Sequence, residues 1–102
     1  MTPAEAEWLL AECRRKIDAL DLQLRDVLNQ RAVIVKEVVR AKESLGMPVY
    51  EGRREQDVVR KVAEGNLGPL GDDALTHIFE IIMGEMRALQ EVYLHKQGNA
   101  GE

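Results

Sequence analysis

The chain has 102 residues, of which 45% are hydrophobic and 31% charged, and its formal net charge at pH 7 is −4. This length and composition favour one mostly helical, soluble domain over residues 1–102, and the acidic balance argues against nucleic acid or a membrane surface as a partner. The apolar runs extend over only a few residues, so none is expected to span a bilayer.

The first predicted element is a helix over about residues 4–45. Thr2 can cap it, Pro3 suits the first helical position, and neither Gly nor Pro interrupts the sequence before Gly46. Apolar residues recur in alternating steps of three and four, which is close to a heptad repeat. We call this stripe the seam, and it consists of Leu10, Cys13, Ile17, Leu20, Leu24, Val27, Arg31, Ile34, Val38, Ala41 and Leu45. Pro48 is expected to end the helix.

Two shorter helices are predicted over about residues 51–64 and 72–96. Apolar residues recur at helical spacing in both, whereas the glycine- and proline-rich stretch 65–73 has turn chemistry. Residues 97–102 are expected to fray. Since no stretch alternates β-branched and polar residues over a useful length, the predicted fold class is all-α, with three helices in a single domain.

The length of the first helix predicts an oligomer. About 40 helical residues span about 60 Å, whereas a compact globule of this size is roughly 33 Å across. The two shorter helices cannot cover a straight helix of that length, so its far half is expected to pack on another copy. The prediction is an intertwined homodimer in which the long helices of two chains pair.

Arg31 occupies a position in the apolar seam, where a charge is costly unless it is paired. It either snorkels or pairs with an internal acid, or it is reserved for an anionic ligand. Lys42 follows on the same face, about 16 Å along the axis, so the two long side chains could hold opposite ends of a small dianion. Arg14 lies about 25 Å before Arg31 and is either exposed to solvent or supplied by a partner chain.

Polar residues also extend the buried stripes of the two shorter helices. Glu51 and Glu55 precede Val58 in steps of four and three, and Gln90 ends a similar line on the third helix. Arg54 is rotated from Glu55 by about 100°. The acids are either favoured simply by the positive end of the helix dipole or form one wall of a site. Gln90 is either a satisfied core amide or a hydrogen-bond donor to a ligand.

The remaining reactive side chains give no sign of a metal or a cofactor. His77 and His95 are about 27 Å apart along one helix, and the single Cys13 has no ligand partner at a metal-binding spacing. The sequence contains neither a glycine-rich phosphate loop nor a nucleophile–base pair. The lone cysteine, and the start MTPAEAEW without the basic and apolar parts of a signal peptide, predict a location in the reducing cytoplasm.

Four stretches carry these unusual residues in order along the chain. They are RRKIDALDLQL (14–24), NQRAVIVKEVVRAK (29–42), MPVYEGRRE (47–55) and HIFEIIMGEMRALQ (77–90). Together they resemble the all-helical, AroQ-type chorismate mutases, and the likeness extends over about residues 9–94. The resemblance implies three helices in each of two interlocked chains, two equivalent sites, and the rearrangement of the dianion chorismate to prephenate without a metal or cofactor.

That rearrangement needs a compact substrate conformer and stabilisation of the negative charge that grows on the ether oxygen. The resemblance implies that substrate is bound by Arg14 from the partner chain, Arg31, Lys42, Glu51, Arg54, Glu55 and Gln90. Among these, Lys42 and Gln90 would donate to the ether oxygen, Arg31 would clamp a carboxylate, and Glu55 would accept from the ring hydroxyl. The implied apolar lining is Val38, Ile82, Met83 and Met86. Met86 stands where some members have a small hydroxyl residue that touches a carboxylate, so it is expected only to pack.

Other functions fit the same residues. An isochorismate pyruvate lyase could use the same fold and a similar cationic site. A helical module without catalytic activity could dock on an enzyme of aromatic biosynthesis, and such an enzyme could equally be the partner of an active mutase. A bare coiled-coil assembly protein would leave Arg31 in the seam and Gln90 without a purpose.

Overall fold

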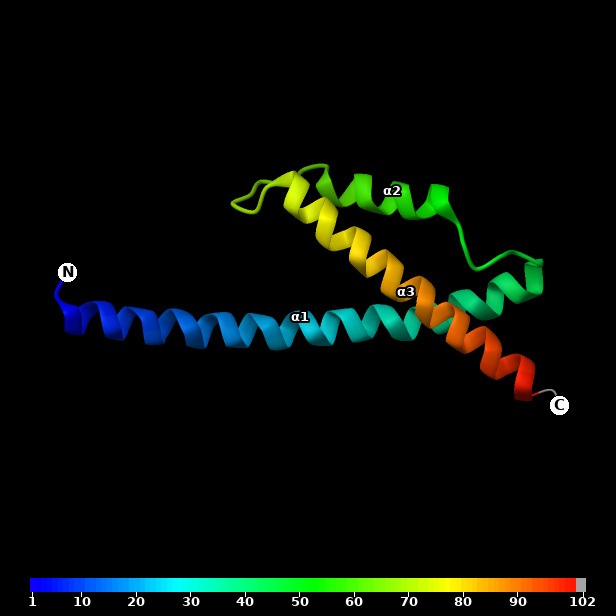
Figure 1. Cartoon of the computed structure of the whole chain (residues 1–102), viewed down its shortest axis with the longest axis horizontal. Coiled ribbons are helices and arrows are strands. Elements are labelled where there is room, and N and C mark those ends of the chain that lie inside the picture. Colours follow the sequence, from blue (N-terminus) through cyan, green and yellow to red (C-terminus); the bar gives the residue numbers. More distant parts are fainter. Residues whose placement is uncertain (101–102) are drawn as a thin grey trace. The chain divides into compact units, whose positions relative to one another are not determined.

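The structure, a computed structural model, describes residues 1–100, with side chains described for residues 1–95. As predicted, the described chain is all-α with three helices: α1 (Pro3–Leu45), α2 (Gly52–Ala63) and α3 (Asp72–Ala100), shown in Figure 1. The helical backbone of α3 continues past residue 96, where we expected it to end, and residues 101–102 lie outside the described part. None of the described helices is both long and apolar enough to cross a membrane.

The chain divides into two compact units, Met1–Val33 and Ile34–Glu102, which we describe separately. The first unit begins with a capped helix, because the Thr2 hydroxyl accepts a hydrogen bond from the Glu5 backbone N–H at 3.1 Å. Most of its apolar side chains are exposed; Leu20 is 60% exposed. The exposed members of the seam in this unit are Leu10, Cys13, Ile17, Leu20, Leu24 and Val27.

α1 ends differently from our expectation. Gly46 has φ +67, and its N–H donates to the Glu43 carbonyl at 3.2 Å, while the Met47 N–H donates to the Lys42 carbonyl at 2.8 Å. These two bonds form a Schellman motif, which requires a left-handed residue directly after the helix. Glycine adopts that conformation without steric cost. Gly46 therefore ends the helix, and Pro48 only follows the break.

The second unit has a small core built from α1 and α3. Val35 and Val39 of α1 are 6% and 1% exposed, and Met83 and Met86 of α3 are also buried. α2 lies against α3 (Figure 1). The buried residues of α1 lie beside the seam and not on it. The seam residues in this unit, Ile34, Val38, Ala41 and Leu45, stay exposed.

Candidate active site

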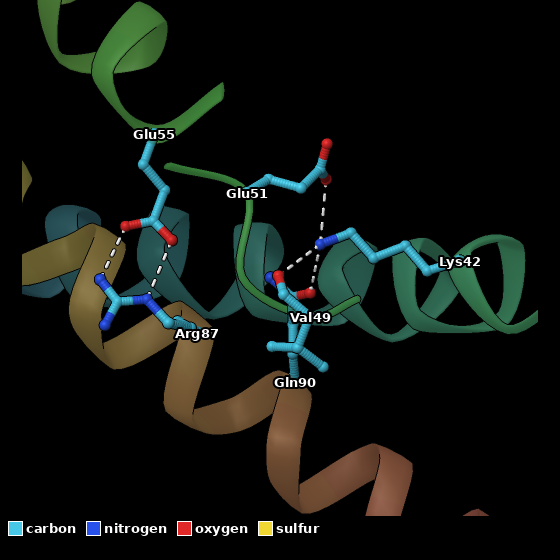
Figure 2. Close-up of polar contacts among 6 residues, drawn as sticks. All are labelled: Lys42, Val49, Glu51, Glu55, Arg87 and Gln90. Carbon is cyan, nitrogen blue, oxygen red and sulfur yellow. Dashed lines mark hydrogen bonds and ion pairs between the residues drawn. The ribbon is translucent and has the colours of Figure 1, made fainter. Parts of the chain in front are cut away.

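Lys42, in the last turn of α1, is a buried cation held by three oxygens. The residue is only 7% exposed, and its Nζ donates to the Val49 carbonyl at 2.7 Å and to Gln90 Oε1 at 2.8 Å. Glu51 Oε1 lies 3.0 Å away and forms an ion pair with it (Figure 2). Two of the three N–H donors of the ammonium group thus make hydrogen bonds, and the Glu51 carboxylate balances its charge. Such partners are what a buried charge requires.

The helix end places these partners around the lysine. Because the Lys42 carbonyl accepts from the Met47 N–H, the chain reverses within a few residues and returns Val49 to the lysine ammonium. The carbonyl end of a helix also carries the negative pole of its dipole, which favours a cation in the last turn. Glu51 directly precedes α2, yet its side chain makes no capping hydrogen bond to that helix. Its carboxylate is directed to Lys42 instead.

Gln90 brings a neutral amide to the same point from α3. Its side-chain oxygen accepts from Lys42, so the amide nitrogen remains as a donor for another group. The residue is half-buried. Lys42 and Gln90, which are 48 positions apart in the sequence, thus form a pair of donors supplied by two helices.

Glu55 on α2 and Arg87 on α3 form a second polar contact, also drawn in Figure 2. Arg87 donates from Nε to Glu55 Oε2 at 2.9 Å and from Nη2 to Oε1 at 2.7 Å, so both carboxylate oxygens are held by one guanidinium. These hydrogen bonds, together with the positive charges of Arg87 and Lys42, lower the pKa of Glu55 against the opposing effect of burial. The same contact raises the pKa of Arg87. Glu55 is therefore held as a carboxylate.

Arg87 is the residue that the sequence analysis missed. The same criterion that singled out Arg31, a charge on an apolar stripe, would have found it. Arg87 follows the apolar Met83 by four positions and precedes Gln90 by three, so it lies on the same face of the third helix as the line that Gln90 ends. Its guanidinium also lies over the Tyr50 ring, 5.2 Å from the centroid, which is a cation–π contact.

A hollow of about 380 Å³ lies between α2 and α3 beside this pair. Its lining includes Tyr50, Glu55, Val59, Met83 and Arg87, whereas Lys42 and Gln90 do not line it. The lining thus combines apolar surface with charged side chains. The two polar contacts therefore differ in their accessibility. Glu55 and Arg87 line the hollow, whereas Lys42 is buried.

The other predicted site residues lie in different surroundings. Arg54 is exposed in the first turn of α2, Val38 is 38% exposed, and Ile82 is half-buried beside the buried Met83. Met86 is 9% exposed and packs in the core, in keeping with its lack of a polar group. The two arginines expected to bind carboxylates belong to the first unit, Arg14 exposed and Arg31 half-buried, and their roles remain predictions.

The second unit thus brings together Lys42, Glu51, Glu55 and Gln90, and adds Arg87. Two cations and two carboxylates cancel, and the uncharged amide of Gln90 supplies a further donor. Ordered cationic donors in a water-poor place stabilise negative charge on an oxygen, and an ionised carboxylate accepts from a hydroxyl. This donor and acceptor set suits a small anion that also carries a hydroxyl group.

Comparison with known proteins finds relatives of the chain in one family. A sequence model of the family described as chorismate mutase type II matches residues 13–91. A chorismate mutase of Methanocaldococcus jannaschii is 31% identical over 93 residues, covering 88% of this chain and 92% of the relative. The solved structure of a Helicobacter pylori chorismate mutase in complex with prephenate superposes with a TM-score of 0.78 at 30% identity, covering 85% of this chain and 94% of that one.

Relatives also occur within longer proteins. A bifunctional chorismate mutase/prephenate dehydratase of Pseudomonas aeruginosa is 33% identical over 98 residues, which cover 87% of this chain but only 27% of the relative. The matched region is therefore about a quarter of that protein, and it corresponds to nearly the whole of the present chain.

Proposed function

Since the chain belongs to the chorismate mutase type II family, we propose that it rearranges chorismate to prephenate. The observation that carries this proposal is the buried Lys42 ammonium held against the Gln90 amide. The rearrangement breaks a C–O bond within one molecule, and negative charge develops on the ether oxygen. A fixed cation and a fixed amide donor stabilise that charge more in the transition state than in the ground state, which lowers the barrier.

The three contacts of Lys42 indicate how substrate enters. Two N–H groups are hydrogen-bonded and the Glu51 carboxylate lies 3.0 Å from Nζ, so a ligand oxygen has to compete with these partners for the ammonium group. The Glu51 carboxylate is the partner that yields, because its side chain is one-third exposed and a dianion brings its own negative charge. Val49 and Gln90 then continue to hold the lysine in place while Nζ donates to the substrate.

Whereas Lys42 donates hydrogen bonds to the substrate, Glu55 accepts one. Held as a carboxylate, it accepts from the ring hydroxyl of chorismate, with the backbone near Glu51 as a second contact. Arg54, exposed at the start of α2, adds positive charge to this wall. The substrate carboxylates bind to Arg31 and to Arg14 of a second chain.

We propose that this second chain is another copy of the same protein. The support is the exposed seam of the first unit, where Leu20 is 60%, Leu24 57% and Val27 56% exposed. A stripe of this kind at heptad spacing is typical of helices that pair with another helix. The two long helices then bury each other's seams, and each chain lends Arg14 to its partner's site.

Prephenate, the proposed product, would be the substrate of a further enzyme. In the bifunctional relatives the names join a chorismate mutase to a prephenate dehydratase. We propose that prephenate made by this chain passes to a separate enzyme of aromatic biosynthesis, which is a candidate partner, and that both work in the cytoplasm.

The proposal is tested with purified protein and chorismate. Loss of the ultraviolet absorbance of chorismate, with prephenate identified as the product, is the expected result. Isochorismate is assayed in parallel, and release of salicylate would instead identify a lyase. A well-folded helical protein that converts neither compound would contradict an enzymatic function.

A further inference from the structure

The Glu55–Arg87 pair offers an inference beyond the roles proposed above. Both oxygens of the carboxylate are taken by one guanidinium, at 2.7 and 2.9 Å. A bidentate contact fixes the plane of the carboxylate as well as its position, because two parallel hydrogen bonds cannot be kept if the group rotates. The remaining lone pairs of Glu55, one on each oxygen, therefore point in fixed directions.

Arg87 is itself held in place. Its guanidinium lies 5.2 Å from the centre of the Tyr50 ring, in the segment that joins α1 to α2. The ring in turn approaches the backbone of Gly52 so closely that a Cβ there would lie 2.7 Å from the Tyr50 hydroxyl oxygen. The chain thus builds a support for Arg87 from the residues on either side of Glu51.

Without Arg87, Glu55 would have another cation within range. Lys42 already acts on Glu55 electrostatically, and it is one of the causes of the lowered pKa of that carboxyl. A carboxylate released from Arg87 can rotate toward the lysine and compete with an anionic ligand for its N–H groups. Loss of the arginine would also leave one cation against two carboxylates, Glu51 and Glu55, at a site that must accept a dianion.

We propose that Arg87 is a positioning residue, which holds Glu55 as a hydrogen-bond acceptor for the substrate hydroxyl and keeps that carboxylate away from Lys42. This inference rests on the proposed chorismate mutase activity. Arg87 acts on the reaction through Glu55 and does not itself contact the reacting atoms.

The test is a double-mutant cycle on turnover of chorismate by the full chain. Arg87→Gln is expected to lower kcat/KM by about tenfold, the size expected for loss of a charge-assisted hydrogen bond. Glu55→Gln lowers it by a similar factor, and the double variant is no worse than Glu55→Gln alone, because the arginine then has no carboxylate to hold. Arg87→Lys restores part of the loss, since it returns the charge without the planar fork.

The pH profile of kcat/KM provides a readout that a merely structural role would not move. In Arg87→Gln the acid limb shifts to higher pH, toward the ordinary pKa of a glutamate, and Arg87→Lys reverses part of the shift. The variant in which Glu55 is replaced shows no such shift. The titratable or charged side chains around Glu55, which stay unchanged across the series, are Lys42 on α1, Tyr50 and Glu51 before α2, Arg60 on α2 and Glu80 on α3.

Arg60→Gln is the matched control. Arg60 is exposed on α2 and pairs with Asp57 and Glu64, so its loss removes one positive charge near the same hollow without touching Glu55. Its activity should stay within about twofold of the wild type. A loss as large as that of Arg87→Gln would show that only the overall charge matters, and would overturn the inference.

The remaining outcomes also decide the matter. An Arg87→Gln effect that is equally large in the Glu55→Gln background would mean that Arg87 works independently of Glu55, and would contradict the proposal while leaving the activity intact. If Arg87→Gln does not fold, judged by helical circular dichroism, the same cycle is run with Arg87→Lys. Absence of turnover in the wild type would instead contradict the proposed function, and this inference with it.

Discussion

The two units of the chain expose and bury opposite kinds of side chain. In the first unit, Met1–Val33, most leucines and Ile17 face solvent, whereas in the second unit Lys42 is only 7% exposed and polar groups surround its ammonium group. Each arrangement would be costly if it served stability alone. The contrast is what the proposals above would produce: a first unit covered by a second copy of the chain, and a second unit that receives an anionic substrate.

The largest effect is expected from removing the buried charge. Lys42→Ala should lower kcat/KM by at least about a hundredfold, the loss found when one electrostatic donor is taken from a developing oxyanion. The control is Arg40→Ala, since Arg40 is exposed two positions away and pairs only weakly with Glu37 at the surface. Steady-state kinetics on both variants, with helix content checked by circular dichroism, give the answer. Equal activity of the two variants would remove Lys42 from the mechanism.

A charge introduced into the seam of the first unit should prevent the proposed pairing of two chains. Leu20→Glu is expected to convert the proposed dimer into monomers and to lower activity more than about tenfold, because a seam position covered by a paired helix does not accept an unpaired carboxylate. Leu22→Glu is the control, since Leu22 is 52% exposed but lies off the seam. Sedimentation velocity measures the mass of each variant. A Leu20→Glu protein that matches the control in both mass and activity would speak against pairing through the seam.

A smaller effect distinguishes the two acids near Lys42. Glu51→Gln removes the competing anion from the ammonium, and we expect KM for chorismate to fall a few-fold while kcat changes little. Glu55→Gln makes the same chemical change at the carboxylate that pairs with Arg87, and it is expected to lower kcat/KM instead. A higher KM in Glu51→Gln would show that this carboxylate helps substrate binding and does not oppose it.

The smallest expected effect concerns stability and pH. The folded pKa of Glu55 lies below its unfolded value, so its ionised pair with Arg87 stabilises the fold above the ordinary glutamate pKa. That contribution is lost as the pH falls through the lowered folded value. The difference in Tm between wild type and Glu55→Gln should therefore be largest near neutral pH and vanish in acid. Thermal melts across that range measure it, and a difference that grows toward low pH would contradict the stated sign.

The sequence predicted the helices well because their signals are local. Helical spacing and the cap at Thr2 are set by residues within one or two turns, and the three helices follow them. The end of α1 was attributed to Pro48, the stronger breaker, although Gly46 comes first and already provides the left-handed residue that a Schellman motif needs. Gly46, which adopts the left-handed conformation without steric cost, therefore ends the helix before Pro48 is reached.

Contacts between distant residues were harder to predict. The resemblance to the family implied that Lys42 and Gln90 donate to the same substrate atom. In the structure Lys42 Nζ lies 2.8 Å from Gln90 Oε1. Glu55 and Arg87 are 32 positions apart on different helices, and the periodicity of either helix does not reveal which of its residues will face the other helix. Nor could the pattern show that Glu51 turns back to Lys42 rather than capping α2.

The end of α1 has a consequence for how this chain can vary in length. Connections between helices usually tolerate insertions and deletions. Here the stretch from Gly46 to Glu51 contacts one lysine three times: Met47 donates to its backbone carbonyl, and its ammonium group donates to the Val49 carbonyl and pairs with Glu51. One residue more or fewer would move the backbone that holds the Lys42 ammonium group. The loop is therefore a fixed spacer, and its length is expected to be as restricted as the identity of Lys42 itself.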